Sequence, residues 1–412
     1  MGSSPSKHAN THIVIIGCGP GGLNCATAAE QAGFRVTLID PKDRFYHSFG
    51  SVRAVSKAGF EDTIMIPFDR LFKKKTNTVI QAFCIGIDEV NKTVKVKHTS
   101  SEKKNEESTI TFDFLILSPG AEYPIWQSAS NNRHEFKELL SSIRASFAAS
   151  KSCTIIGGGA VGLEAAGEIK HNIPHLDVTL VSSPANLLAN DKQLIPLMRD
   201  LCLEDAKKAG IRVLLNAKVD NIQEIESRDD VDTIIRGFYK GKDGKEIKLS
   251  ITQKDNNNKT EELLTNMVLV ATGGKPNTEF LKTTKIPLNS QGCIEVTPFY
   301  QVRGLETVFA LGDAAASGEP KLAFVAKMQS EIIIKNIAAC VNKSSLKKGP
   351  VHLLPIGVVP IGPQFGRGQI PGILRPNVLK SIAAFKSGDY LVGMVLPQLN
   401  YSLNDVHSKN KE

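Results

Sequence analysis

Long apolar runs, paired cysteines and metal-ligand patterns are all missing from this 412-residue sequence. Because it has no uncharged apolar run of about 18 residues or more, we expect no transmembrane helix. The nine histidines lack metal-ligand spacing, so we assign no metal. The N-terminus has neither an apolar signal-peptide core nor an Arg-rich amphipathic presequence, which argues against secretion and against import into the mitochondrial matrix.

The cysteines are too scattered to form a redox-active pair. The seven lie at positions 18, 25, 84, 153, 202, 293 and 340, and no two are arranged as C-x-x-C. Most lie in apolar, strand-like or helix-like settings, where a buried thiol is the ordinary outcome. We therefore expect a reducing compartment and no relay of electrons through a disulfide.

Acidic residues are outnumbered by basic ones, and the formal net charge is +8. The lysine runs at 73–75, 103–104 and 347–348 are short and are typical of solvated loop edges, although such clusters can also favour anionic lipid. No nucleic-acid-binding motif accompanies them, so we do not expect nucleic acid as a partner. The hydrophobic fraction of 41% and charged fraction of 22% are those of a soluble globular protein with two or three domains.

A glycine-rich turn follows the first apolar strand pattern. Residues 11–16 run into Gly17, and Gly19 and Gly22 complete a G-x-G-x-x-G motif ahead of a helical pattern that ends near residue 33. In this motif the glycines allow a tight turn, close approach of a pyrophosphate, and packing of the helix on the strand. The next strand pattern, 34–39, ends in Asp40, where a Rossmann unit places the acceptor for a ribose hydroxyl; an ordinary turn acid is the alternative.

The same pattern occurs a second time. Residues 153–156 run into Gly157, Gly159 and Gly162, and the closing strand 178–181 ends at Ser182 and Ser183 instead of an acid. Without a carboxylate to repel a 2′-phosphate, NADP is not excluded, yet no Arg stands beside the serines, so the coenzyme preference stays open. Two copies imply two dinucleotides in one chain, and hence electron transfer between them.

The rest of the sequence predicts further strands and helices. We expect a hairpin from 82–87 and 93–96, a loop over 100–108, a strand over 112–117, a helix over 133–149, a β-meander over 233–252 around a turn at 242–245, strands at 267–270 and 308–314, and a helix over 324–342. From residue 350 onward, apolar segments punctuated by Pro and Gly predict a small C-terminal module.

The order of these motifs resembles a known family. With Ala-Thr-Gly at 271–273 and Leu-Gly-Asp at 311–313, the chain from about residue 11 to 395 is similar to the two-dinucleotide-binding-domain flavoproteins. Segments 159–170, 320–323 and 386–389 resemble the branch of apoptosis-inducing-factor-like, membrane-associated NAD(P)H:quinone oxidoreductases. Two departures are Ser-Pro-Gly at 118–120 in place of Ala-Thr-Gly, and poor similarity over 394–412.

The resemblance implies an α/β fold of the glutathione-reductase type, with two Rossmann-like domains and the C-terminal module. It assigns 8–122 and 290–346 to an FAD-binding domain, 123–289 to an NAD(P)H-binding domain and 347–412 to the module. The cofactor would be FAD, with NADH or NADPH as co-substrate.

The resemblance also implies roles for particular residues. Those at the FAD site would be Gly17, Gly19, Gly22, Asp40, Lys42, Arg53, Cys84, Gly120, Asp313, Lys321 and Ala323. Asp313 would bind the ribityl chain, and Lys321 and Ala323 would lie near the pyrimidine edge of the flavin; for Arg53 a surface salt bridge is the alternative. Those at the NAD(P)H site would be Gly157, Gly159, Gly162 and Gly273. Glu164 and Lys386 would be catalytic, although Glu164 is also readable as an ordinary acid at a helix N-terminus.

The expected reaction is transfer of a hydride from NAD(P)H to FAD, then of electrons to a lipophilic, ubiquinone-like quinone reached through the apolar segment 353–373. Residues 1–6 fit the acceptor motif for N-myristoylation at Gly2, with an expression-vector leader as the alternative. With the basic surface, the acyl group predicts a cytoplasmic protein attached to the plasma membrane, lipid droplets or the mitochondrial outer surface. A reductase of a small carrier protein or soluble radical, a non-catalytic DNA-binding apoptosis effector, and a homodimer all remain open.

Overall fold

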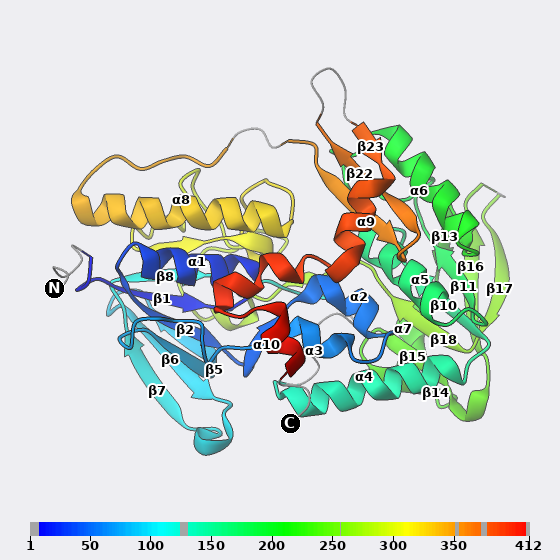
Figure 1. Cartoon of the computed structure of the whole chain (residues 1–412), viewed down its shortest axis with the longest axis horizontal. Helices are drawn as coiled ribbons and strands as arrows, with labels where there is room; N and C mark the ends of the chain where they lie inside the picture. Colours follow the sequence, from blue (N-terminus) through cyan, green and yellow to red (C-terminus); the bar gives the residue numbers. More distant parts are fainter. Residues whose placement is uncertain (1–7, 124–130, 256, 351–353, 372–376, 409–412) are drawn as a thin grey trace.

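The computed structural model describes residues 8–123, 131–255, 257–350, 354–371 and 377–408, and it places the two glycine motifs in two separate sheets (Figure 1). The first motif lies in a seven-stranded sheet of order β20-β8-β1-β2-β5-β6-β7. The first four strands and the start of β5 are parallel, and β6 and β7 continue the sheet antiparallel. The strands are β1 (His12–Ile16), β2 (Arg35–Asp40), β5 (Thr78–Asp88), β6 (Thr93–His98), β7 (Glu107–Thr111), β8 (Phe114–Leu117) and β20 (Val308–Ala310).

Two helices cover one face of this sheet. Helix α1 (Pro20–Gln31) packs beside α8 (Ala323–Asn342), and Figure 1 shows the two lying side by side above β1 and β8. Every residue of β1 and β8 is buried, as expected for parallel strands covered on both faces. A smaller antiparallel pair, β3 (Arg44–Tyr46) and β4 (Met65–Pro67), and two short helices, α2 (Ser51–Ala54) and α3 (Phe60–Ile64), lie between β2 and β5 in the chain.

The second motif lies in a six-stranded sheet of order β12-β11-β10-β18-β15-β14. Its strands are β10 (Ser152–Ile156), β11 (Asp177–Val181), β12 (Arg212–Leu214), β14 (Val231–Ile235), β15 (Phe238–Gly241) and β18 (Met267–Val270). The helices of this part are α4 (Arg133–Ala148), α5 (Ala160–Asn172), α6 (Pro196–Lys208) and α7 (Ile222–Ile225). Two short strands, β9 (Ala121–Glu122) and β19 (Lys275–Pro276), pair where the chain passes between the two parts.

The predicted β-meander over 233–252 is wrong. Strands β14 and β15 form a hairpin on the six-stranded sheet, but β16 (Ile247–Gln253) pairs instead with β13 (Ala217–Val219) and β17 (Lys259–Thr265) in a sheet of their own. A short helical turn over 242–244 separates β15 from β16, so the chain leaves one sheet and enters the other at the predicted turn. The expected loop over 100–108 likewise ends in strand β7.

Residues just before the predicted boundary at 289 pack on the first sheet. Leu281 and Ile286 belong to the same apolar cluster as Val14 and Leu115, which lie in that sheet. The predicted domain limits stay predictions.

The C-terminal residues form a small sheet and a return segment. Strands β21 (Gly357–Ile361), β22 (Phe365–Ile370) and β23 (Asn377–Leu379) are antiparallel, and helix α9 (Lys380–Asp389) packs on β22. Beyond α9 the chain runs back to the first sheet, and the last described element is α10 (Leu403–Ser408), drawn red in Figure 1. Tyr401 Oη donates to Asp69 Oδ1 at 2.5 Å, so this return segment is tied to the half of the molecule that holds the seven-stranded sheet.

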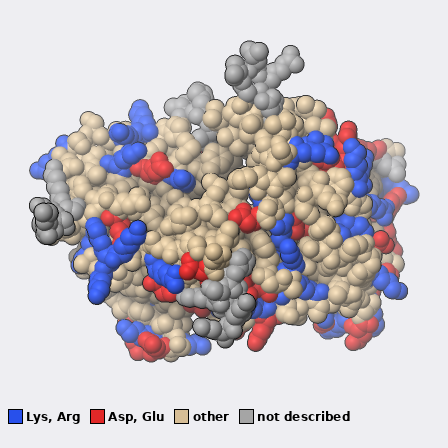
Figure 2. Space-filling view, in the orientation of Figure 1, with Lys and Arg blue, Asp and Glu red and all other residues tan. Residues whose placement is uncertain are grey.

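Across the face shown in Figure 2, Lys and Arg side chains alternate with Asp and Glu and do not form one basic field. Among the described helices, none has both the length and the apolar character needed to span a bilayer.

Candidate functional site

At two positions of the first glycine turn there is no room for a side chain. At Gly17, where φ is +90°, a Cβ would come within 2.3 Å of the Ser118 carbonyl oxygen, and at Gly22 it would come within 1.9 Å of the Gly17 carbonyl oxygen. At Gly19 nothing lies within 4 Å of the same point. The first and third glycines are therefore required by packing, whereas the second faces open space at the N-terminus of α1, the side from which a phosphate would approach.

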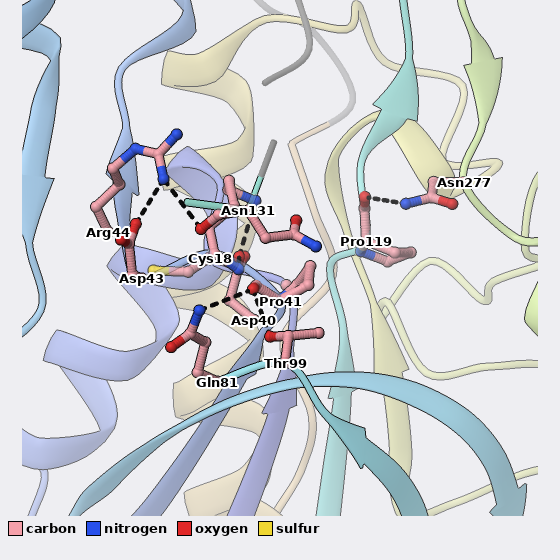
Figure 3. A network of polar contacts seen from close by, with 12 residues as sticks. Cys18, Asp40, Pro41, Asp43, Arg44, Gln81, Thr99, Pro119, Asn131 and Asn277 are labelled. Atoms are coloured by element: carbon pink, nitrogen blue, oxygen red, sulfur yellow. Dashed lines mark hydrogen bonds and ion pairs between the residues drawn. The ribbon is translucent and has the colours of Figure 1, made fainter. Parts of the chain in front are cut away.

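Asp40 connects the end of β2 to this turn. Its carboxylate is 2% exposed and accepts from the Cys18 amide at 2.7 Å, from the Lys42 amide at 3.0 Å and from Lys42 Nζ at 2.8 Å. Figure 3 shows Asp40 beside Cys18 and Pro41, whose carbonyl oxygen accepts from Thr99 Oγ1 at 2.7 Å. The buried carboxylate thus lies beside the phosphate turn, as a ribose acceptor must.

Two neighbouring strands deliver further predicted residues to the same edge of the sheet. Gly120 follows β8, Asp313 follows β20, and the carboxyl ends of parallel strands meet at one edge. Tyr123 Oη donates to Asp313 Oδ2 at 2.8 Å, and Lys321 Nζ donates to the Gly312 carbonyl oxygen at 3.2 Å. Burial and the Asp313 charge both raise the pKa of Tyr123, so its phenol stays protonated and positions the carboxylate. A Cβ on either Gly120 or Gly312 would meet nothing within 4 Å.

The second glycine turn repeats the geometry of the first. At Gly157, where φ is +129°, a Cβ would lie 2.5 Å from the Ala271 carbonyl oxygen, and at Gly162 it would lie 2.0 Å from the Gly157 carbonyl oxygen. Gly159 and Gly273 again face open space. The four glycines predicted for the coenzyme site therefore meet at the carboxyl edge of β10 and β18.

Glu164 and Lys386, predicted as catalytic from opposite ends of the chain, are in contact. Lys386 Nζ donates to Glu164 Oε1 at 2.5 Å and to the Val358 carbonyl oxygen at 3.1 Å. Glu164 is 4% exposed and is the fifth residue of α5, so it is not an ordinary acid in the first turn of a helix. Burial raises the pKa of Glu164, while the Lys386 charge and hydrogen bond oppose that rise.

The family assignment follows from the sequence match to a known group. A family model described as pyridine nucleotide-disulphide oxidoreductase matches residues 11–330, which include both glycine turns, Glu164 and Asp313. The chain belongs to this family. It is accordingly a flavin oxidoreductase that uses FAD and a pyridine nucleotide.

Relatives of known name are similar to this chain in sequence or in fold over nearly its full length. Ferroptosis suppressor protein 1 of Mus musculus is 29% identical over 402 residues, which cover 95% of this chain and 97% of the relative. The solved structure of NDH2 from Plasmodium falciparum in complex with NADH has a TM-score of 0.71 at 14% identity, covering 98% of both chains. The sulfide:quinone oxidoreductase of Aquifex aeolicus has a TM-score of 0.70 at 17% identity, covering 97% of this chain and 94% of the other. The predicted α/β fold with two Rossmann-like sheets is thereby confirmed.

Arg53 lies apart from the glycine turns, in a buried cluster. It is 5% exposed, its guanidinium pairs with Glu168 of α5, and it also donates to Ser387 Oγ at 3.0 Å. Tyr390 Oη donates to the same Glu168 carboxylate at 3.0 Å. The alternative of a surface salt bridge is therefore wrong, because the pair joins α2, α5 and α9 in the interior.

Cys84 is the predicted residue least connected to the others. It lies on β5 beyond Gln81, the last residue that pairs with β2, and its thiol points back to the Gly86 carbonyl oxygen of its own strand at 3.7 Å. Burial raises the pKa of the Cys84 thiol to about 12, so it stays protonated near neutral pH. Ala323 is the first residue of α8, two residues after Lys321, and Gly2 lies outside the described residues.

The sequence patterns missed two residues of these clusters, Tyr123 and Glu168. Glu168 could have been found, because Glu164 and Glu168 lie one turn apart on a helix of mostly small and apolar residues, and two acids on a buried face require partners. Tyr123 could not have been found, because it meets Asp313 only through the fold.

The residues present fit both nucleotides that the family implies. At each turn two glycines cannot accept a Cβ while the middle one opens on empty space, which is the shape a pyrophosphate needs. Asp40 offers the FAD site a buried acceptor, and Ser182 offers the coenzyme site a buried hydroxyl.

Proposed function

We propose that the protein catalyses the reaction NAD(P)H + H⁺ + quinone → NAD⁺ or NADP⁺ + hydroquinone, with a lipophilic, ubiquinone-like acceptor at a membrane surface. The single observation that carries the proposal is the buried Glu164–Lys386 pair, because it joins the coenzyme-binding helix to the C-terminal module. The flavin, when bound, supplies the redox chemistry, since it accepts two electrons as a hydride and returns them to an acceptor.

The chain's own residues would hold the two nucleotides at the carboxyl edges of the two sheets. Gly17, Gly19 and Gly22 would receive the FAD pyrophosphate, with Asp40 at its ribose and Asp313 at its ribityl hydroxyls. Lys321 would place a cation near the flavin ring, where it stabilises negative charge. Gly157, Gly159, Gly162 and Gly273 would hold NAD(P)H.

The ion pair would supply the proton that the reaction consumes. Hydride transfer brings two electrons and one proton, so hydroquinone formation requires one further proton. Glu164 Oε1 and Lys386 Nζ lie 2.5 Å apart and are both largely buried, so the pair would hold a proton that could pass to the acceptor.

A partly apolar cavity supports a lipophilic acceptor. It measures about 370 Å³, and its lining combines the apolar side chains of Leu322, Phe324, Leu354 and Ile356 with polar ones that include Lys192, Gln193 and Glu319. In the chain, Leu322 lies between the predicted flavin residues Lys321 and Ala323. Leu354 is 62% exposed and Phe324 38%, which would suit an opening toward lipid. Leu354 and Ile356 belong to the apolar segment expected to form the quinone access route, part of which lies outside the described residues. The sulfide:quinone oxidoreductase named above shares the fold, and by its name it acts on a quinone.

Membrane attachment would come from Gly2 acylation together with basic side chains. A single acyl chain binds a bilayer only marginally, so the second signal has to be electrostatic. The expected location is the cytoplasmic side of a membrane. To test it, the wild type and Gly2→Ala are each co-expressed with an N-myristoyltransferase, and their flotation with vesicles of anionic lipid is compared. Equal flotation would argue against the lipid anchor.

Anaerobic titration tests the reaction directly. NADH or NADPH should bleach the flavin absorbance of the purified protein, and a short-chain ubiquinone should restore it. Glu164→Gln and Lys386→Met should slow the quinone step at least tenfold, whereas Lys380→Met, an exposed lysine on the same helix, should leave it unchanged. Purified protein without flavin would contradict the proposal. Restoration by a carrier protein or by a soluble radical, but not by quinone, would favour those acceptors instead.

A further inference from the structure

Ser182 occupies in the second sheet the position that Asp40 occupies in the first. Ile16 pairs with Ile39 and Ile156 with Val181, so Asp40 and Ser182 are each the next residue after the matched pair. Ser182 is 1% exposed, and within the described part of the chain its Oγ has no hydrogen-bond partner. It lies against the glycine turn, because a Cβ on Gly158 would come within 2.4 Å of that oxygen.

An unpartnered buried hydroxyl is costly, and a ligand at this turn would satisfy it. Nearly all buried polar groups in native proteins have partners, so each exception needs a cause. The end of this strand is where a Rossmann unit meets the adenosine ribose of its dinucleotide. A hydroxyl here can donate to a phosphate, whereas a carboxylate would repel one.

The fold brings a cation to the neighbouring serine. Lys254 follows β16, and its Nζ lies 2.8 Å from Ser183 Oγ and 3.2 Å from the Ser183 carbonyl oxygen. An ammonium has three donors, so these two contacts leave one, and Ser183 Oγ keeps its own hydrogen to donate. The adjacent Asp255 carboxylate accepts from Asn216 Nδ2 at 2.5 Å.

The two nucleotide sites therefore differ in how their lysines are used. In the first, Lys42 Nζ is paired with the Asp40 carboxylate at 2.8 Å, so its charge is compensated. In the second, the only polar contacts of Lys254 Nζ with the described residues are to the hydroxyl and the carbonyl oxygen of Ser183, neither of which carries a formal charge. The second site thus combines a cation and two hydroxyls without a carboxylate at the strand end.

We propose that Ser182, Ser183 and Lys254 form a subsite for the 2′-phosphate of the coenzyme, so that the protein prefers NADPH to NADH. This inference rests on the proposed binding of NAD(P)H at the second glycine turn. The cation and the hydroxyl of Ser183 bind the phosphate, and the hydroxyl of Ser182 binds the ribose or the same phosphate.

Binding of 2′,5′-ADP and 5′-ADP to the flavin-loaded protein, measured by calorimetry in low salt, tests the subsite without any turnover. The wild type should bind 2′,5′-ADP at least tenfold more tightly than 5′-ADP. Lys254→Ala should weaken 2′,5′-ADP binding by roughly tenfold, the usual size for one charge-assisted contact, and leave 5′-ADP binding unchanged. Lys248→Ala removes a lysine of β16 that pairs with Glu262 and should change neither.

A second variant keeps the test independent of lysine packing. Ser183→Asp adds a carboxylate at a partly exposed position and should abolish the discrimination. It should also lower the ratio of kcat/KM for NADPH to that for NADH at least tenfold. Equal binding of the two nucleotides by the wild type, binding of neither, or equal weakening of both by Lys254→Ala would overturn the proposal. Failure of the flavin proposal has a different signature, namely purified protein that carries no flavin.

Discussion

Arg53 and Glu168, 115 residues apart in the chain, form a buried two-point ion pair in which Nε and Nη2 lie 2.9 and 2.8 Å from Oε2 and Oε1. The guanidinium also stacks over Tyr390 at 4.7 Å from the ring centroid and donates to the Gly388 carbonyl oxygen at 3.1 Å. The pair therefore holds α2 of the first half, α5 of the second and the end of α9 together. One turn earlier on α5 lies Glu164 with its partner Lys386, so the same cluster positions the proposed catalytic pair.

Removing one member of this pair should destabilise the fold strongly. Arg53→Met leaves the Glu168 carboxylate buried without its cation, which typically costs about 3–5 kcal/mol of unfolding free energy. Denaturant unfolding followed by far-UV circular dichroism measures the loss. The control is Arg303→Met, because Arg303 is 65% exposed and its 3.8 Å pair with Glu295 is worth at most about 1 kcal/mol. A loss below 1 kcal/mol for Arg53→Met would contradict the assigned role.

Replacing both members should cost less than replacing one. Arg53→Met combined with Glu168→Leu removes both charges and keeps apolar volume, and such replacements are often neutral or stabilising. The double variant should therefore be more stable than Arg53→Met alone. If the two losses simply add, the residues do not act as a pair.

Substitution of the middle glycine in each turn should distinguish the FAD site from the NAD(P)H site. Gly19 and Gly159 have φ near −77° and open space at the Cβ position, so alanine fits the protein itself. Gly19→Ala should fold normally but be purified with little FAD, because its methyl occupies space the pyrophosphate needs. Gly159→Ala should retain FAD and show a KM for NAD(P)H raised roughly tenfold or more, a cost of about 1–3 kcal/mol. Flavin loss from Gly159→Ala, or normal flavin content in Gly19→Ala, would reverse the site assignment.

The pH dependence of activity should shift when Lys386 is removed. Burial raises the pKa of Glu164 and Lys386 opposes that rise, so Lys386→Met should raise the pKa further. Any limb of the kcat/KM profile that reports Glu164 ionisation should move to higher pH, and Lys386→Arg should largely restore it. At pH values below 4.5, the ordinary pKa of Glu, the raised pKa of Glu164 stabilises the folded state. This stabilisation is lost as the pH rises through the folded-state pKa. An unshifted profile would argue that Glu164 does not titrate during turnover.

His47 should make the fold sensitive to mild acid. Its ring is 2% exposed and contacts the Tyr390 carbonyl oxygen at 2.7 Å, and burial lowers its pKa below 6.5. The unfolded chain therefore takes up a proton that the folded chain refuses, so stability is present above pH 6.5 and falls as pH drops toward the folded-state pKa. His47→Asn should reduce the difference in Tm between pH 7.5 and pH 5.5. His12, whose pKa is also lowered by burial, should account for part of the remainder.

Local patterns in the sequence predicted the two glycine turns and the strands and helices around them. Both G-x-G-x-x-G motifs, the strands before them and the acid or serine at the end of the next strand lie within about 30 residues of each other, as one βαβ unit requires. Each of these features depends on contacts inside that unit, such as the Cβ exclusion at Gly22 by Gly17. The helices over 133–149 and 324–342 were predicted almost to their ends for the same reason.

Strand pairing and ion pairs depend on contacts between segments that are far apart in the sequence, so local patterns did not predict them. The period-2 pattern over 233–252 is equally compatible with one meander or two sheets, and only burial against β18 and β13 selects two. Glu164 meets Lys386 from 222 residues away, and Ser183 meets Lys254 from 71. By itself, the sequence determined where the two glycine turns lie, because such a turn is built from neighbouring residues. Only the tertiary structure decided which charges lie near the turns, because a buried charge finds its partner across elements that the chain order keeps apart.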